Sequence, residues 1–394
     1  MLGKYLAQSA GYPDKLLGRK GFRMIEMRFL RWSVIFALVI SGCSIEVAQP
    51  SVQTPDSIMT NPGTSATNDT TQIPVTWSSL NLTGKLIYSM GAIEKDVYVI
   101  RVLSLDLITG QVTTIYQAPN SAWVYYVSVS PDGEQLVMSF SPPPGTDPEV
   151  VQALYVMPID GSRPPQLLFQ PQIREDQYTQ AEWSPDGKYI YYTHVNYQFP
   201  IDPNRVYPLY QIFRMEYPGG QPQLIAEEAY WPRLSSDSTR LTYISIDPLS
   251  IKQQLIIADA DGGNAQEVSL SGSYIPDIKD APIFSPDEVS ILFSAAVPTQ
   301  SRQPTWFENL MGMRLARANG SVPSDWWSVP INGGELTRLT HIQAPSLYAS
   351  LSPDHRHVVS FSGAGVFVMN VDGSELTILL PNPDQFIGTV QWIP

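Results

Sequence analysis

The stretch AEWSPDGKYIYY, residues 181–192, decides the fold, because it reads as two short strands joined by a tight turn. Its Ser-Pro-Asp turn recurs along the chain. The copies are Ser130-Pro131-Asp132, Ser184-Pro185-Asp186, Ser285-Pro286-Asp287 and Ser352-Pro353-Asp354, with Ser235-Ser236-Asp237 as a degenerate copy. The successive Asp residues are 54, 51, 50 and 67 positions apart. Repeats of roughly 40–50 residues that each hold several short strands predict a β-propeller.

A second repeated turn gives the number of blades. Six Gly-bearing turns lie between flanking strands: Thr109-Gly110, Asp160-Gly161, Pro218-Gly219-Gly220, Asp261-Gly262-Gly263, Asn332-Gly333-Gly334 and Asp372-Gly373. Such turns mark hairpins, because Gly and Asn tolerate a positive φ. We therefore predict an all-β, six-bladed propeller with four antiparallel strands in each blade.

The first blade lacks an inner strand at its own start. The C-terminal residues 390–394 (VQWIP) align with residues 181–185 (AEWSP), so we expect the C-terminus to supply this strand and close the ring. The alternative inner strand is Pro74–Trp77, just before the first blade.

Composition agrees with a β protein and excludes one class of partner. The chain has 394 residues, 35 of them Pro and 20 Tyr, and only 15% are charged. The net charge is −13, and it becomes −18 without the first 42 residues, which hold seven basic and two acidic side chains. A protein with this negative charge repels the phosphate backbone of nucleic acids, so nucleic acid is not expected as a partner.

The N-terminal region resembles an export signal. A basic segment precedes the apolar run WSVIFALVI, residues 32–40, and Ile40-Ser41-Gly42-Cys43 follows. This ending resembles the lipobox of bacterial lipoproteins, which implies lipidation of Cys43, the one cysteine; the alternative is a buried structural cysteine. We interpret residues 1–42 as a signal peptide whose true start is Met24 or Met27. Residues 43–78 are then a disordered tether, and residues 79–394 the propeller.

The repeat carries a family resemblance over roughly residues 80–394. The form x-x-Trp-Ser-Pro-Asp-Gly-Lys-x-Ile-x-Tyr, followed by a strand and Asp-Gly-Gly, resembles the WD40-like repeat of the TolB-type six-bladed β-propellers. Ser236 replaces the turn proline, and Glu288 and His355 replace the glycine after Asp. The N-terminal α/β domain of TolB has no counterpart among these repeats. The resemblance implies an envelope protein that works by contacting other proteins.

The two faces of the predicted ring differ. All the A–B and C–D turns are tight, whereas residues 141–152, 195–208, 270–279, 296–324 and 381–388 form long segments on the opposite face. Since binding sites concentrate on loops held by a rigid scaffold, we expect the site there. Residues 296–324 predict a helical insertion that is either a lid or simple packing. The candidate binding face comprises Tyr197, Phe199, Tyr207, Arg302, Trp306, Phe307, Arg314 and Arg317.

Catalytic motifs are missing from the sequence. It holds no Gly-x-Ser-x-Gly, no His-Glu-x-x-His and no cysteine pair, and its four histidines fall at different ends of their blades. We therefore expect no catalytic residue, metal or cofactor. The expected protein is a lipid-anchored, extracytoplasmic module that binds envelope proteins, peptides or cell-wall polymers. The alternative is a polysaccharide lyase or hydrolase with its site over the central channel.

Overall fold

The structure is a computed structural model that describes residues 69–94, 97–146, 148–197, 208–298, 322–344, 347–362, 365–381 and 387–394. All described residues belong to one compact unit, Ile58–Pro394. Cys43 and the predicted signal peptide lie outside the described residues, as do residues 299–321 of the predicted helical insertion 296–324, whose described ends, Ala296 and Ser324, belong to strands. Among the described residues, no helix has both the length and the apolar character needed to cross a membrane.

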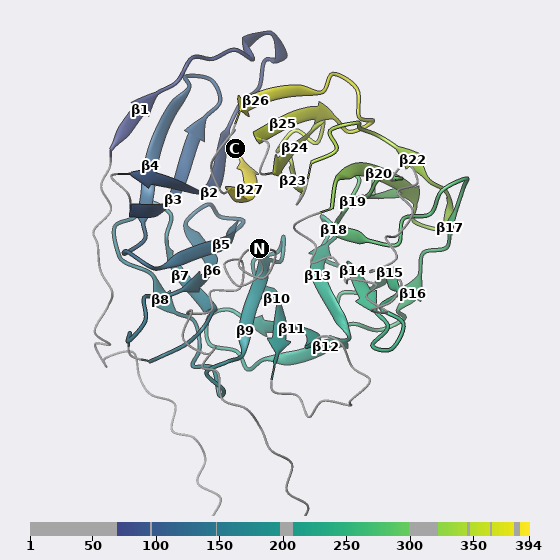
Figure 1. Ribbon diagram of the computed structural model, residues 1–394, viewed down its shortest axis with the longest axis horizontal. Helices are drawn as coiled ribbons and strands as arrows, with labels where there is room; N and C mark the ends of the chain where they lie inside the picture. The colour runs from purple at the N-terminus through teal and green to yellow at the C-terminus, as the bar shows by residue number, and fades with distance from the viewer. Residues whose placement is uncertain are drawn as a thin grey trace, which may run out of the picture. The chain divides into compact units, whose positions relative to one another are not determined.

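Six antiparallel blades surround a central axis, as predicted (Figure 1). In order from the inner to the outer strand they are as follows: blade 1, β27 (Ile387–Ile393), β2 (Lys85–Glu94), β3 (Val97–Asp106) and β4 (Gln111–Gln117); blade 2, β5 (Trp123–Val129), β6 (Gln135–Ser141), β7 (Ala153–Pro158) and β8 (Gln166–Leu167); blade 3, β9 (Gln177–Trp183), β10 (Tyr189–Asn196), β11 (Leu209–Glu216) and β12 (Gln223–Glu227); blade 4, β13 (Ala229–Leu234), β14 (Arg240–Ile246), β15 (Gln253–Asp259) and β16 (Gln266–Glu267); blade 5, β18 (Lys279–Phe284), β19 (Ser290–Ala296), β20 (Ser324–Pro330) and β22 (Thr337–Arg338); blade 6, β23 (Tyr348–Leu351), β24 (His357–Ser362), β25 (Gly365–Asn370) and β26 (Thr377–Pro381).

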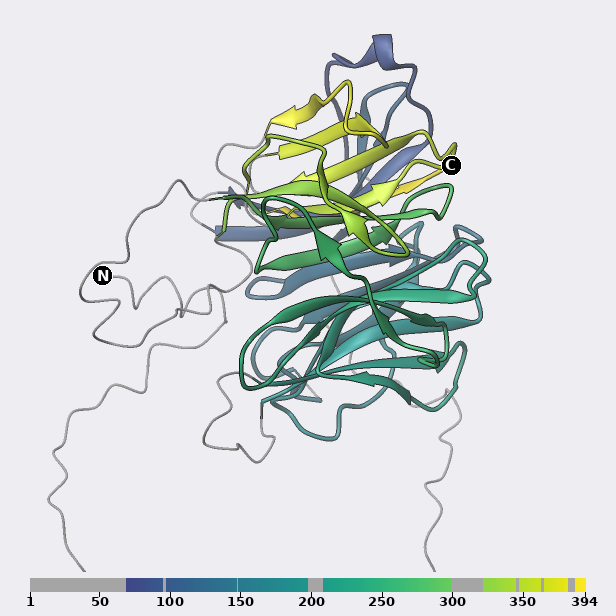
Figure 2. The same cartoon turned by 90° about the vertical axis from the view of Figure 1, so that its right-hand side faces the viewer.

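Seen from the side, the strands run across the thickness of the ring, so each blade has one end on either face (Figure 2). We call the face with the A–B and C–D turns the tight-turn face and the opposite one the loop-rich face. A short parallel pair, β17 (Leu270–Ser271) with β21 (Gly334–Glu335), joins blades 4 and 5.

The Ser-Pro-Asp turns share one hydrogen-bond pattern. In each of the five copies the Ser Oγ donates to the Asp Oδ1 over 2.5–2.7 Å, and it accepts from the backbone N–H five residues later over 2.9–3.0 Å. The residue after Asp is left-handed in every copy, with φ from 56° to 75°. Ser238, Glu288 and His355 therefore adopt at this position a backbone conformation that normally favours Gly.

The C-terminal strand closes the ring, which confirms the prediction. Strand β27 pairs antiparallel with β2, with Trp392 opposite Leu86 and Val390 opposite Tyr88. A Cβ at Gly84 would lie 2.3 Å from the Ile393 carbonyl oxygen, so only glycine lets the two segments approach so closely. The alternative, Pro74–Trp77, does not form the inner strand.

Residues 69–78, which were expected to belong to the tether, are part of blade 1. Strand β1 (Thr70–Gln72) pairs antiparallel with β4 and adds a fifth, outermost strand. Trp77 is 2% exposed and its Nε1 donates to the Leu107 carbonyl oxygen over 2.8 Å. A short 3-10 helix, Ser78–Leu80, follows. Blade 1 therefore contains both ends of the described chain.

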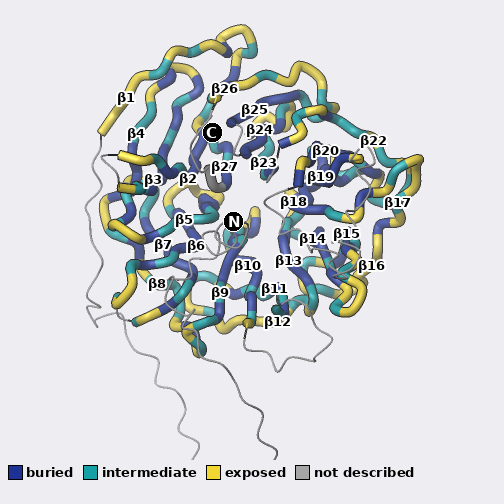
Figure 3. Tube along the Cα trace, viewed as in Figure 1, coloured by how far each residue is buried: buried dark blue, intermediate teal, exposed yellow. Residues whose placement is uncertain are grey.

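The core lies between blades, because the buried residues of neighbouring blades form shared hydrophobic clusters. Figure 3 shows these buried residues along the strands of every blade. Hydrogen bonds also join the inner strands of neighbouring blades. In each, a side-chain oxygen on one strand accepts from a backbone N–H of the other strand. Thr389 Oγ1 accepts from Val127 N over 2.9 Å, and Gln180 Oε1 accepts from Trp231 N over 3.0 Å. Ser350 Oγ accepts from Trp392 N over 3.1 Å. These bonds satisfy backbone groups that the curved ring leaves without a strand partner.

Candidate binding face and central axis

Tyr197 is the one member of the predicted binding face that the described residues include. It follows the end of β10 on the loop-rich face and is 46% exposed. The other predicted members, Phe199, Tyr207, Arg302, Trp306, Phe307, Arg314 and Arg317, lie outside the described residues, so the arrangement of the whole set stays a prediction.

Tyr197 belongs to a series of aromatic side chains that we call the aromatic arc. It comprises Tyr98, Trp123, Tyr125, Tyr197 and Tyr210, from blades 1 to 3, and each lies at or next to a strand end on the loop-rich face. The Tyr98 and Trp123 ring centroids are 5.0 Å apart, and those of Trp123 and Tyr125 are 6.1 Å apart in a stacked arrangement. Three of the five rings, those of Tyr98, Trp123 and Tyr125, are therefore linked by direct contacts.

The phenol groups of the arc are electrostatically linked. Burial raises the pKa of Tyr125, and the nearby phenol of Tyr197 raises it further. Burial also raises the pKa of Tyr210 to about 12, with contributions from Tyr197 and Asp280. Both tyrosines thus keep their O–H groups at neutral pH, and the Tyr125 phenol is hydrogen-bonded to Ser141.

Three aromatic rings meet at the axis of the propeller, and we call them the axial triad: Tyr126, Trp231 and Tyr348. They come from the inner strands of blades 2, 4 and 6, yet their ring centroids are only 5.0–5.9 Å apart. Residues from non-adjacent blades approach this closely only across the axis. The triad therefore closes the axis at its level, and a ligand arriving from the loop-rich face meets a floor.

The sequence contained a signal for the axial triad that the pattern search missed. Each of the three residues lies four positions before the Ser of its turn: Tyr126 before Ser130, Trp231 before Ser235 and Tyr348 before Ser352. The same position in blades 3 and 5 holds Gln180 and Ala281. Large rings alternate with smaller side chains around the axis, which leaves room for three rings rather than six.

Paired ionisable groups also lie on or beside the first two strands of blade 3 and the inner strand of blade 4. His194 Nε2 is 2.9 Å from Asp176 Oδ2, and the imidazole stacks on Tyr178 with centroids 4.7 Å apart. Arg233 forms an ion pair with Glu182, and burial lowers the pKa of Arg233 to about 10. Each of these is a pair. In the part of the chain that the structure describes, no three or more His, Cys, Asp or Glu side chains are grouped so as to hold a metal ion.

No model of a protein family matches the sequence, and no curated protein matches it. Several solved structures, however, have a similar fold. TolB from Acinetobacter baumannii is 15% identical and superposes with a TM-score of 0.54, over 79% of this chain and 67% of that one. The fold is a TolB-like six-bladed propeller.

Two further structures complete the comparison with the TolB-like propeller. A chain solved as TolB from Agrobacterium tumefaciens is 19% identical with a TM-score of 0.49, over 79% of this chain and 100% of that one. A chain of the nidogen/laminin complex is 8% identical with a TM-score of 0.50, over 78% and 97%. At these identities the likeness concerns the fold alone.

Proposed function

We propose that this protein is a non-catalytic binding module that holds a partner protein or peptide on its loop-rich face. The observation that carries the proposal is the aromatic arc on blades 1 to 3, beside an axis that the axial triad closes. An open channel would favour passage or deep enclosure of a small ligand. A closed axis below linked aromatic rings instead favours a broad, shallow contact of the kind that proteins make.

The composition of the arc supports a protein or peptide ligand. Tyr and Trp are enriched at the energetic centres of protein interfaces, because they contribute large contact areas with few rotatable bonds. The similar propeller in the nidogen/laminin complex is part of a complex between two proteins, which fits this use of the fold.

Site-specific cross-linking tests the proposal. A photoreactive amino acid at position 197 should capture a partner from an envelope extract, whereas the same group at position 108 should not, because Ile108 is also exposed (64%) but lies in a turn on the tight-turn face. The captured protein is then purified and its affinity measured directly. Tyr197→Ala should weaken binding by about tenfold or more, and Ile108→Ala should leave it unchanged. Equal capture at both positions would contradict the proposed face.

The location is part of the same proposal. Lipidation of Cys43 would keep the propeller outside the cytosol and attached to a membrane. Cys43→Ala should therefore move the protein from the membrane fraction to the soluble fraction. Unchanged membrane retention would remove the lipid anchor while leaving the binding proposal standing.

The rival enzyme hypothesis has its own test. The His194–Asp176 pair is the described feature that most favours it, since a carboxylate orients a general base in this way. Wild type and His194→Ala should both fail to release new reducing or unsaturated ends from neutral and acidic polysaccharides. Release by wild type that His194→Ala abolishes would replace the binding module with an enzyme.

A further inference from the structure

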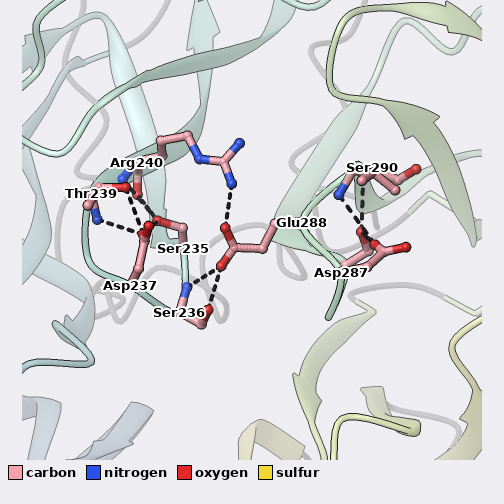
Figure 4. A network of polar contacts seen from close by, with 10 residues as sticks. Ser235, Ser236, Asp237, Thr239, Arg240, Asp287, Glu288 and Ser290 are labelled. Carbon is pink, nitrogen blue, oxygen red and sulfur yellow. Dashed lines mark hydrogen bonds and ion pairs between the residues drawn. The ribbon is translucent and has the colours of Figure 1, made fainter.

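A charged contact latches blade 4 to blade 5 on the tight-turn face (Figure 4). Glu288, which follows the turn aspartate of blade 5, accepts hydrogen bonds from Ser236 N over 2.7 Å and from Ser236 Oγ over 2.6 Å. Its other carboxylate oxygen is bonded by Arg240, the first residue of β14. The Arg240 side chain also covers the ring of Phe284, 5.2 Å from its centroid. These contacts, which we call the latch, join the two blades on this face.

The next seam, between blades 5 and 6, lacks the latch. Ser290 begins β19 as Arg240 begins β14, and the two positions correspond. In each, the backbone N–H donates to the Oγ of the turn serine five residues earlier. His355 follows its turn aspartate as Glu288 does, and has the same left-handed backbone. A short serine side chain thus replaces the long arginine, and an imidazole replaces the carboxylate. An open groove of about 610 Å³ lies at this seam, within the size range of small-molecule sites.

The groove offers hydrogen-bond groups of both kinds. His355 and Arg356 lie on one side, and within the described residues their side chains make no hydrogen bond. Asp287 and Asp372 also line it, and in each the Oδ1 is occupied by the local turn while no hydrogen bond to Oδ2 is formed by a described residue. The buried Leu292 provides an apolar part of the floor.

The mixture of charges decides the class of ligand. A carboxylate would gain from Arg356 but would be repelled by Asp287 and Asp372, and an amine would meet the opposite conflict. A sugar hydroxyl avoids both, because it accepts from a guanidinium and donates to a carboxylate at the same time. We propose that the groove between blades 5 and 6 is a binding site for neutral oligosaccharides.

Calorimetric and ligand-detected NMR titrations of the full-length protein test the proposal. The probes are chitotriose, cellotriose and maltotriose as neutral trisaccharides, with trigalacturonate and trilysine as charged ones. At least one neutral trisaccharide should bind, and neither charged probe should bind more tightly. Arg356→Ala should weaken binding by about tenfold or more, which corresponds to the loss of a hydrogen bond to a charged group. Lys188→Ala, in the corresponding turn of blade 3, should have no effect.

A second variant uses the latch itself. The double substitution Ser290→Arg with His355→Glu copies the Arg240–Glu288 contact into the empty seam. It should keep or raise the thermal midpoint while removing trisaccharide binding. Binding that survives this filling, tighter binding of a charged probe, or failure of all three neutral sugars to bind at 10 mM would each overturn the proposal. None of these results bears on the loop-rich face, which lies on the other side of the ring.

Discussion

Replacing Trp392 by alanine tests how much the C-terminal strand contributes to the closed ring. The indole is 5% exposed, and its Nε1 donates to the Thr83 carbonyl oxygen over 2.8 Å. It also stacks on His357 with ring centroids 6.1 Å apart, and its backbone N–H is bonded by Ser350 of blade 6. This residue therefore contacts both the segment just before β2 in its own blade and the neighbouring blade 6.

The expected loss follows from this burial. Truncation of a buried Trp to Ala costs about 3–5 kcal/mol, because the apolar contacts are lost and a cavity is left. For a large domain this lowers the thermal midpoint by roughly 5–10 °C. Circular dichroism during heating measures the midpoint. Ile108→Ala is the matched control, since Ile108 is also in blade 1 but is 64% exposed, and it should shift the free energy of unfolding by less than about 0.5 kcal/mol.

A truncation extends the same test. Deletion of residues 389–394 removes the buried Val390 and Trp392 together with the Thr389 bond to blade 2. It should lower the midpoint further, and a synthetic peptide of residues 387–394 should restore part of the loss. If both Trp392→Ala and the truncation melt within 1 °C of wild type, as Ile108→Ala does, the idea that β27 holds the ring closed is wrong.

Three further predictions concern the turns and the latch. His355→Gly should raise the free energy of unfolding by up to about 1 kcal/mol, because φ is 60° at this position; a lower thermal midpoint would contradict this. Glu288→Ala should cost about 1–3 kcal/mol in denaturant titrations, since it leaves Ser236 and Arg240 without their acceptor, and Glu134→Ala, in the exposed turn of blade 2, should cost little. Hydrogen bonds from Ser235 and Thr239 lower the pKa of Asp237 from 3.8 to about 2, so its contribution to stability is complete above about pH 4 and is lost as the pH falls towards 2; Asp237→Asn should flatten this part of the melting profile, and an unchanged acid dependence would speak against it.

Much of the fold could be predicted from the sequence because the repeats are local. The bond from Ser184 to Asp186 spans two residues, so the chemistry of each turn is complete within its own segment. The pairing of β27 with β2 could also be predicted, since Trp392 occupies the position that Trp183 has in blade 3. The strand Thr70–Gln72 was missed because three exposed polar residues carry no apolar alternation.

The candidate sites could be predicted less well, because they depend on the geometry of the whole ring. Tyr126, Trp231 and Tyr348 are separated by more than a hundred residues each, and nothing in a local pattern says that three blades send rings to one point. The groove arises from a difference between two seams, which becomes visible only when Ser290 is compared with Arg240. Tyr197 could be placed on the loop-rich face because it directly follows a strand, and its part in binding stays a prediction.

The closing strand also sets an order on biosynthesis. Thr83 and Trp392, which are bonded across blade 1, are 309 positions apart in the chain. While the ribosome is still making the later blades, strand β2 has an unpaired edge that can join another chain. The nascent polypeptide must therefore be shielded until its final segment emerges, and premature termination anywhere after blade 1 would leave a product prone to aggregation.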